Sequence, residues 1–429
     1  MSLTAMASVS VLPPGERVRR WLEVTPVYQT PLVQAALARA TGNDDCAWWD
    51  LLPFMTKRDW QKNFPANFLP WAASVDELED HPEIELDFTS GTSGERAPLI
   101  MPRGWWAVQE RRALFLNRHV ARILDKIASP RRATLSAPVC NGDVSYIGRP
   151  SFVDRSVGGT LYLSLSANPW LWGAVEFERI AMEIAQWQPD FLDLDPVYGA
   201  AFARFCRERK LRFPTVKFIL SSYEFVSVVH RTLMEEIFAV PVFNLYGSTE
   251  TGHLLMEDEH QRLRPSGETA FLECVEPSPE GAAQIVVTTL SNDVMPLVRY
   301  RIGDHVERLS DESGDHFRLL GRVRDAFQIA GRIVTTAEVD ACFAGMTGIA
   351  HYQLAQIAAD RFRLRYIADG SGPDSARLVE LRGELGRLLG SGSEVALEQV
   401  DQLLAERSGK FRLTVPLANP ARPEPLLVS

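Results

Sequence analysis

The chain has 429 residues and a hydrophobic content of 46%, enough for a large core and for more than one domain. Its formal net charge of -10 argues against general binding to nucleic acid or to an anionic membrane, although a local basic cleft stays open. The five cysteines are scattered and none lies in a C-x-x-C pair, so they indicate reduced thiols and neither a disulfide framework nor a zinc ribbon.

The chain shows no targeting or membrane-spanning pattern. Its first residues lack a basic region followed by an apolar run, and Pro13 and Pro14 interrupt them. The longest uncharged stretch, residues 156–175, contains Gly158, Gly159 and Pro169, which is typical of strand and loop. We therefore expect a cytoplasmic protein without nucleic-acid or membrane partners.

Helical and strand patterns alternate through the first half of the chain. A helical pattern covers residues 104–127, and strand patterns follow at 132–138 and 158–167. This alternation predicts an α/β fold of layered, mostly parallel sheets. The later elements expected in this part are helices at 172–187, 196–210 and 228–239 and strands at 189–195, 216–222 and 240–247.

The pattern changes twice in the second half. Residues 269–320 read as short strands and turns, which predicts a β-rich subregion of the large domain. After Gly331, helices at 335–345 and 374–389 and strands at 350–358, 361–368 and 393–400 predict a small α+β domain. We expect a large N-terminal domain over residues 1–322 and a small, mobile C-terminal domain over residues 323–429.

Glycines and small hydroxyls form an unusual run, "TSGTSG", at residues 89–94, directly after a short apolar strand. Glycine lets backbone N–H groups approach an anion closely, and Ser and Thr hydroxyls add further donors. The run is not a Walker A loop, because Gly94 is followed by Glu95. A plain strand-to-helix turn stays open as an alternative for this run alone.

Four further motifs follow in order: "NLYGSTETG" from Asn244, "VRYRIGD" from Val298, "GRVRD" from Gly321 and "ERSGKFR" from Glu406. With "TSGTSGERAP", they resemble the adenylate-forming superfamily of acyl-CoA synthetases, peptide-synthetase adenylation domains and luciferases. The resemblance spans about residues 51–412. "LPFMTKRDWQKNFP" at 52–65 and "HYQLA" at 351–355 are most similar to the phenylacetate-CoA ligase branch.

The resemblance implies that the first motif wraps the β- and γ-phosphates of ATP. The family usually has a lysine after the second glycine, where this chain has Glu95, so Arg96 is a candidate for the missing charge. The residues that this assignment involves are Thr89, Ser90, Gly91, Thr92, Ser93 and Gly94.

The second motif would bind the rest of the nucleotide. By resemblance, Tyr246 stacks on adenine, Thr249 contacts the α-phosphate and Glu250 holds Mg²⁺, which prefers hard oxygen ligands. Taken alone, the motif also fits a strand ending in a capped turn. The other residues expected to bind the cofactor here are Asn244, Gly247 and Ser248, with Ser222, Tyr223 and Glu224 from the segment that passes adenine.

The last motifs imply ribose binding, a hinge and a catalytic lysine. Asp304 would accept hydrogen bonds from the ribose hydroxyls, and Arg322 would reach the ribose or phosphate region. Lys410, on the small domain, would join Thr249 and Glu250 as a catalytic residue and bridge the substrate carboxylate and the α-phosphate. Either Arg324 or Asp325 would serve as the hinge between half-reactions.

The acyl pocket is less defined. Tyr223, Phe225, Tyr146 and Cys140 are candidates to line it, and aromatic walls suit an aromatic or other planar acid. For each aromatic residue taken alone, an ordinary core position is the better explanation. His253 and His260 flank an acidic run; without paired cysteines, we expect solvated surface there and no metal site.

The expected activity is ATP- and Mg²⁺-dependent conversion of a small carboxylic acid to acyl-AMP and pyrophosphate, followed by transfer to coenzyme A. Alternative acceptors are an amine, another nitrogen nucleophile or a separate carrier protein. A nucleotide-binding protein without catalysis and a generic ligand-binding protein also stay open. The resembled branch suggests a homodimer.

Overall fold

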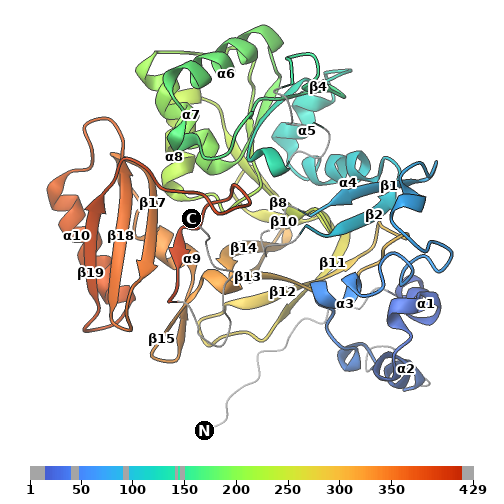
Figure 1. The fold of residues 1–429 in the computed structure, drawn as a ribbon. Coiled ribbons are helices and arrows are strands. Elements are labelled where there is room, and N and C mark those ends of the chain that lie inside the picture. Colours follow the sequence, from blue (N-terminus) through green and yellow to red (C-terminus); the bar gives the residue numbers. More distant parts are fainter. Residues whose placement is uncertain (1–14, 40–47, 90–95, 141–143, 145–149, 418–429) are drawn as a thin grey trace.

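The computed structural model describes residues 15–39, 48–89, 96–140, 144 and 150–417. Figure 1 shows a helical N-terminal group, a large central sheet and a smaller sheet near the C-terminal end. Residues 90–94 of the expected phosphate loop and Tyr146 lie outside the described residues. Of the helices that the structure does describe, none has the length and apolar character needed to cross a lipid bilayer.

A sheet of twelve strands forms the centre, in the order β11-β12-β13-β14-β10-β9-β8-β7-β6-β3-β5-β4. Five neighbouring strands are parallel, as expected for strands linked by helices. They are β3 (Arg132–Leu135), β5 (Thr160–Tyr162), β6 (Phe191–Leu194), β7 (Ile219–Ser221) and β8 (Val242–Ser248), with β4 (Ser156–Val157) antiparallel at the edge.

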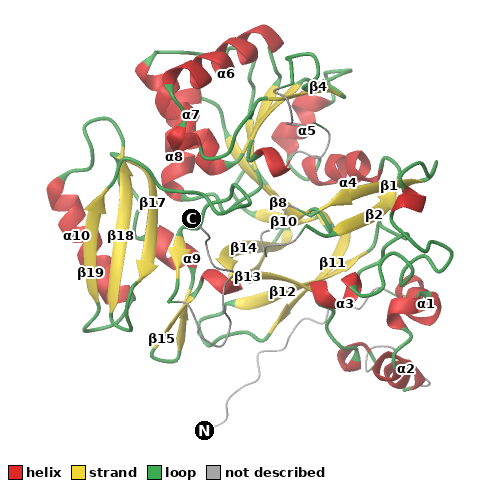
Figure 2. Ribbon diagram, in the orientation of Figure 1, coloured by secondary structure: helices red, strands yellow, loops and turns green. Residues whose placement is uncertain are grey.

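Helices cover both faces of these parallel strands (Figure 2). Alternate side chains explain this: Leu192 and Leu194 of β6 pack into one apolar cluster, and Phe191 packs into the opposite one. The first cluster includes α6 (Ala174–Trp187), α7 (Pro196–Glu208) and α8 (Val228–Phe238), and the second includes α4 (Trp105–Leu114) and α5 (Arg118–Leu124).

Beyond β8 the same sheet continues with antiparallel strands. These are β9 (Gly252–Glu257), β10 (Leu263–Pro265), β11 (Ala270–Val275), β12 (Ala283–Thr289), β13 (Tyr300–Asp311) and β14 (Gly314–Arg322). The predicted α/β layering is confirmed. The parallel arrangement is limited to the first half, and the β-rich residues 269–320 extend the central sheet because the β8–β9 hairpin reverses the strand direction at its edge.

The N-terminal elements pack against the antiparallel half through a common apolar cluster. Short 3₁₀ turns connect the helices, and a two-stranded hairpin ends next to the expected phosphate loop. The elements are α1 (Glu16–Val24), α2 (Pro31–Ala38), α3 (Lys57–Gln61), β1 (Ile84–Phe88) and β2 (Pro98–Pro102), with the turns η1 (Pro26–Tyr28), η2 (Trp49–Leu51) and η3 (Asp76–Leu78).

The last part of the chain forms a separate sheet of order β19-β18-β17-β20, with its own apolar cluster. A capping box of Thr335 and Glu338 starts its first helix. Its elements are β17 (Ile349–Gln356), β18 (Arg361–Ala368), β19 (Glu394–Gln399), β20 (Thr414–Val415), α9 (Thr336–Ala341) and α10 (Ser375–Leu388), preceded by η6 (Val323–Asp325) and the hairpin of β15 (Phe327–Ile329) and β16 (Arg332–Val334).

Candidate functional site

A cavity of about 110 Å³ lies where the small sheet meets the central one. Strand ends from β7, β8, β13 and β14 form one side, and the loop before β20 closes it. The predicted site residues that line it are Tyr223, Glu224, Asn244, Tyr246, Gly247, Asp304, Arg322, Arg324, Asp325 and Lys410. Residues up to 187 positions apart in sequence are therefore brought together as expected.

The β8–β9 turn carries Thr249 and Glu250, the expected α-phosphate and Mg²⁺ contacts, which follow the cavity-lining Gly247 but do not themselves line the cavity. Gly247 is required by close packing, because a Cβ there would lie 2.1 Å from the carbonyl oxygen of Gly252. The Tyr300 hydroxyl donates to Oε1 of Glu250 over 2.9 Å. Glu250 is thereby oriented by a neighbouring strand, and Ser248 is held in the turn by a hydroxyl contact to Thr251.

Asp304 lies between two partners at the cavity wall. The Tyr246 hydroxyl donates to its Oδ2 over 2.7 Å, and Arg322 Nε lies 3.1 Å from its Oδ1. Asp304 and Arg322 are register partners of the β13–β14 hairpin, which explains their contact. Burial first, and then the Asp304 charge, raise the pKa of Tyr246, so its ring keeps a neutral phenol toward the cavity.

Residues 222–224 cross the cavity floor in a strained conformation. Tyr223 has a φ of 75°, which costs about 1–3 kcal/mol for a residue with a side chain. Hydrogen bonds from the hydroxyls of Ser222 and Tyr223 to Asp193 support it, and Arg132 in turn lies 3.4 Å from Asp193. Ser222 therefore points into this buried network and away from the cavity.

Lys410 enters the cavity from the loop before β20. Its Nζ donates to the carbonyl oxygen of Tyr223 over 3.2 Å, and the N–H of Phe411 donates to Oε1 of Glu224 over 2.8 Å. Gly409, with a φ of 77°, packs so closely that a Cβ would lie 2.6 Å from the Cβ of Ala137. The Tyr198 hydroxyl also donates to the Gly409 carbonyl.

The two hinge candidates have different surroundings. Asp325 is buried, and its Oδ1 lies 2.7 Å from Nε of Arg412. Arg324 is 41% exposed and lies 3.0 Å from Glu406. Both candidates thus contact the lysine-bearing loop at residues 406–412.

At the phosphate motif, the structure describes Thr89 and Arg96. The Oγ1 of Thr89 accepts hydrogen bonds from Lys57 Nζ at 3.1 Å and from the N–H of Ala97 at 3.0 Å. The Arg96 guanidinium lies over the Phe88 ring instead. Lys57 is thus a cation at the motif that sequence analysis missed, although its segment, "LPFMTKRDW", had been noted for its resemblance.

The described residues hold no group of three or more His, Cys, Asp or Glu side chains placed to bind a metal by themselves. Glu250 fits the expected Mg²⁺ because one carboxylate, completed by phosphate oxygens and water, is a usual magnesium site. The expectation of solvated surface around His253 is wrong. His253 packs against Trp106 and contacts Gln109, and burial lowers its pKa. His260 is exposed as expected.

Of the nearby acidic run, Glu257 and Asp258 are buried, whereas Glu259 is exposed as expected. Glu257 pairs with Arg231, and Asp258 pairs with Arg262 and Arg264. Of the acyl-pocket candidates, Tyr223 and Phe225 line the cavity. Cys140 lies in η4 (Pro138–Cys140), where burial raises the pKa of its thiol to about 11 and disfavours a thiolate nucleophile.

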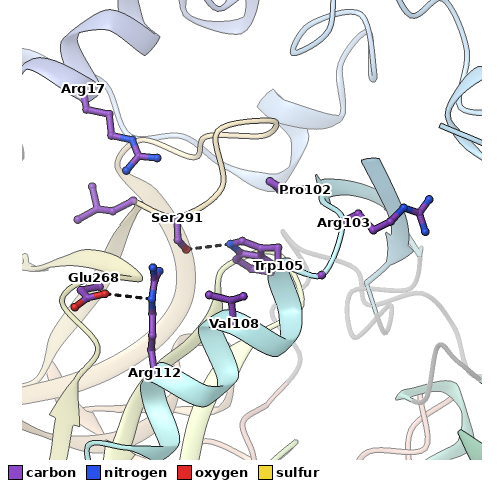
Figure 3. A pocket seen from close by; sticks show the side chains of 10 residues that line it. Arg17, Pro102, Arg103, Trp105, Val108, Arg112, Glu268 and Ser291 are labelled. Carbon is purple, nitrogen blue, oxygen red and sulfur yellow. Dashed lines mark hydrogen bonds and ion pairs between the residues drawn. The ribbon is translucent and has the colours of Figure 1, made fainter. Parts of the chain in front are cut away.

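A larger cavity, of about 560 Å³, opens elsewhere, between the β2–α4 turn and the β11 side of the sheet (Figure 3). Its Arg112 pairs with Glu268, and Trp105 donates to the Ser291 hydroxyl. Arg17, at its rim, pairs with Asp293. None of the predicted site residues lines this cavity.

Solved structures with the same overall fold are adenylate-forming ligases. A 2-hydroxyisobutyryl-CoA ligase bound to an acyl-AMP matches with a TM-score of 0.67 and 18% identity, over 94% of this chain and 87% of that one. The chain has the adenylate-forming fold. The anthranilate-CoA ligase AuaEII, bound to anthranoyl-AMP, matches with a TM-score of 0.55 and 15% identity, over 80% and 69% of the two chains.

A third structure with the adenylate-forming fold, the amide bond synthetase McbA of Marinactinospora thermotolerans, matches with a TM-score of 0.52 and 16% identity, over 79% and 70% of the chains. Among curated proteins, Protein CapK of Staphylococcus aureus is 23% identical over 244 residues. That match covers 54% of this chain and about half of CapK, also 54%. No family model matches the chain.

Proposed function

We propose that this protein uses ATP to activate a carboxylic acid as acyl-AMP, with release of pyrophosphate, and then transfers the acyl group to coenzyme A. The observation that carries the proposal is the position of Lys410. Its ammonium enters the same cavity as Tyr246, Asp304 and Arg322, the residues expected to hold the nucleotide. The adenylate-forming fold supports this choice.

In the first step, an oxygen of the substrate carboxylate attacks the α-phosphorus of ATP. The bond from that phosphorus to the bridging oxygen breaks, and its electron pair leaves with pyrophosphate. No protein nucleophile is needed, because positioning and electrostatic stabilisation are sufficient. Lys410 would stabilise the charge that develops between the carboxylate and the α-phosphate, and Thr249 would donate to the same phosphate.

Glu250 is the residue that would hold Mg²⁺, which neutralises phosphate charge when bound. Tyr300 fixes the orientation of this carboxylate. Lys57 would act at the other end of the triphosphate. Its contact with Thr89 brings an ammonium to the phosphate motif, which has Glu95 at the position where resembled proteins carry lysine.

The second step would use a rotation of the small domain, residues 323–429, against the large domain, residues 1–322. Asp325 or Arg324 would absorb the rotation, which removes Lys410 and exposes the acyl-AMP to the acceptor. The sulfur of the acceptor would attack the acyl carbon, its proton would pass to solvent, and AMP would leave with the electron pair of the broken carbon–oxygen bond. Coenzyme A is the proposed acceptor because two of the solved neighbours are CoA ligases. An amine acceptor is the second candidate, since one neighbour is an amide bond synthetase.

Acid-dependent exchange between pyrophosphate and ATP tests the first step without a guess about the acceptor. We expect exchange with one class within a panel of aryl, arylacetic, amino-aryl and short aliphatic acids. Lys410→Ala should abolish it, whereas Lys126→Ala, at an exposed lysine after α5, should not change it. ATP binding without exchange for any acid would contradict the proposal.

The acceptor is tested with acyl-AMP that the protein itself forms from ATP and the acid. Discharge by coenzyme A, followed as thioester, is expected to exceed discharge by a panel of amines at equal concentration. If an amine discharges acyl-AMP faster than coenzyme A does, the protein is an amide synthetase, and the proposed first step is unchanged.

A further inference from the structure

A second buried acid lies behind the cavity, at the start of α7. Asp195 is fully buried, and its Oδ1 caps the helix by accepting the N–H groups of Val197 at 2.9 Å and Tyr198 at 3.3 Å. Its Oδ2 is buried and finds no hydrogen-bond donor among the described residues. The carboxyl of Glu224 is a neighbouring group that interacts with Asp195.

Glu224 connects this acid to the catalytic loop. Its Oε1 accepts the N–H of Phe411, and Lys410, one residue earlier, donates to the carbonyl oxygen of Tyr223. The carboxyls of Asp195 and Glu224 thus interact with each other next to the loop that carries Lys410. Two ionised carboxylates can only accept hydrogen bonds, so a bond between them requires one proton.

The electrostatic surroundings favour that proton. Burial raises the pKa values of both carboxyls, that of Asp195 to about 7, and the charge of Asp195 raises that of Glu224 further. The Lys410 ammonium lowers both pKa values, and a side-chain hydrogen bond with Glu224 lowers that of Asp195. Glu406 adds a further negative charge on the side of Glu224. The thiol of Cys140 and the phenol of Tyr198 also face the pair, and burial keeps both neutral.

We propose that Asp195 and Glu224 share one proton near neutral pH and thereby position the Lys410 ammonium for acid activation. This inference rests on the proposed function. With one proton, the pair carries a single negative charge, which Lys410 balances. Without this proton, the pair carries two negative charges. These charges attract the Lys410 ammonium away from the substrates, and they repel the incoming carboxylate and α-phosphate. Asp195 is a positioning residue, since it acts through Glu224 and Lys410.

A purely structural role as a helix cap makes a different prediction. Asparagine caps a helix about as well as aspartate, so Asp195→Asn keeps the cap and removes only the ionisation. Asp374→Asn is the matched control. Asp374 caps α10 through the N–H groups of Ala376 and Arg377, on an exposed helix of the small domain.

The first test is the pH profile of pyrophosphate–ATP exchange. In the wild type, we expect exchange to fall by roughly tenfold per pH unit above the second ionisation of the pair. In Asp195→Asn and Glu224→Gln, this alkaline fall should shift upward by at least about one pH unit, whereas Asp374→Asn should retain the wild-type profile. An unchanged alkaline fall in both site variants would overturn the inference.

The second test does not need catalysis. An acid whose pKa is raised by folding loses stabilisation as pH rises from its unfolded value, about 3.9, to its folded value. The melting temperature of Asp195→Asn should therefore rise relative to wild type between about pH 5 and pH 8. Lys410→Met, which removes the balancing cation, should raise the pKa values of the pair further and extend this loss of stability to higher pH than in the wild type.

The two tests separate the two proposals. If no variant shows exchange but the melting temperatures behave as expected, the proposed function is contradicted and the shared proton is supported. The opposite result is exchange in the wild type together with the same pH dependence of the melting temperature in wild type, Asp195→Asn and Lys410→Met. That result would overturn the shared proton and support acid activation.

Discussion

The Nε atom of Arg412 lies 2.7 Å from Oδ1 of Asp325, with the two side chains only 8% and 11% exposed. This ion pair joins a hinge candidate to the loop that carries Lys410. Both residues belong to residues 323–429, so the pair fixes the Lys410 loop against the hinge segment and thereby helps to hold the lysine at the cavity. Removing one partner from a largely buried pair leaves an uncompensated charge, at a cost of about 3–5 kcal/mol for full burial.

Asp325→Asn should therefore weaken the docking of the Lys410 loop on the hinge segment. We expect pyrophosphate–ATP exchange to fall by roughly tenfold or more, since about 1.4 kcal/mol of lost docking gives that factor. Transfer from preformed acyl-AMP should change less. Arg363→Gln is a control, because Arg363 and Glu398 form a half-exposed pair 3.8 Å apart in the same domain. Equal losses in both half-reactions would argue against a docking role.

Lys57→Ala should weaken the interaction with the terminal phosphates. The loss of a charged hydrogen bond predicts an increase in KM for MgATP, or a fall in exchange, of roughly 10- to 100-fold. Arg96→Ala should have a smaller effect, because the Arg96 guanidinium lies over the Phe88 ring. Steady-state exchange kinetics measure both, with the exposed Lys62 changed to Ala as control. A larger effect at Arg96 than at Lys57 would reverse the assignment.

Asp304 should allow the protein to distinguish the ribose of ATP from deoxyribose. ATP and 2′-deoxy-ATP are the informative pair of substrates, because they differ by one hydroxyl that Asp304 is expected to bind. In the wild type, the deoxy analogue should exchange less well, by about 1 kcal/mol or roughly fivefold. In Asp304→Ala, this difference should vanish while KM for both nucleotides rises. A preserved difference would place the ribose elsewhere.

Gly247→Ala should damage the turn that carries Thr249 and Glu250. The new Cβ would meet the backbone of Gly252 and His253, which cannot move without disrupting the β8–β9 register. We expect a loss of roughly 1–3 kcal/mol of stability, measured by chemical unfolding. Gly383→Ala, in α10, meets no atom within 4 Å and should instead stabilise by about 0.5–1 kcal/mol. A neutral Gly247→Ala would show that the turn tolerates a shift.

Several features could be predicted from local sequence. The alternating helices and strands from residue 132 to residue 247 follow from apolar periodicity and from the lengths between breaks. The ordered motifs identified residues that line the cavity, including Tyr246 and Asp304 on strands and Lys410 on the loop before β20. Glycine, hydroxyl and carboxylate residues at such places are required by the chemistry of phosphate and Mg²⁺ binding, which depends on residue type.

Other features depend on contacts between distant segments, which periodicity does not encode. The β-rich residues 269–320 join the central sheet only because the β8–β9 hairpin offers them an edge. Lys57 meets Thr89 across 32 residues, and His253 is covered by Trp106 of another element. Asp195 and Glu224 interact although 28 residues separate them in the sequence, and burial raises the pKa values of both. The sequence by itself determined which groups are present and which elements carry them. Only the tertiary structure decided which charges face each other out of water, because desolvation and pairing depend on packing.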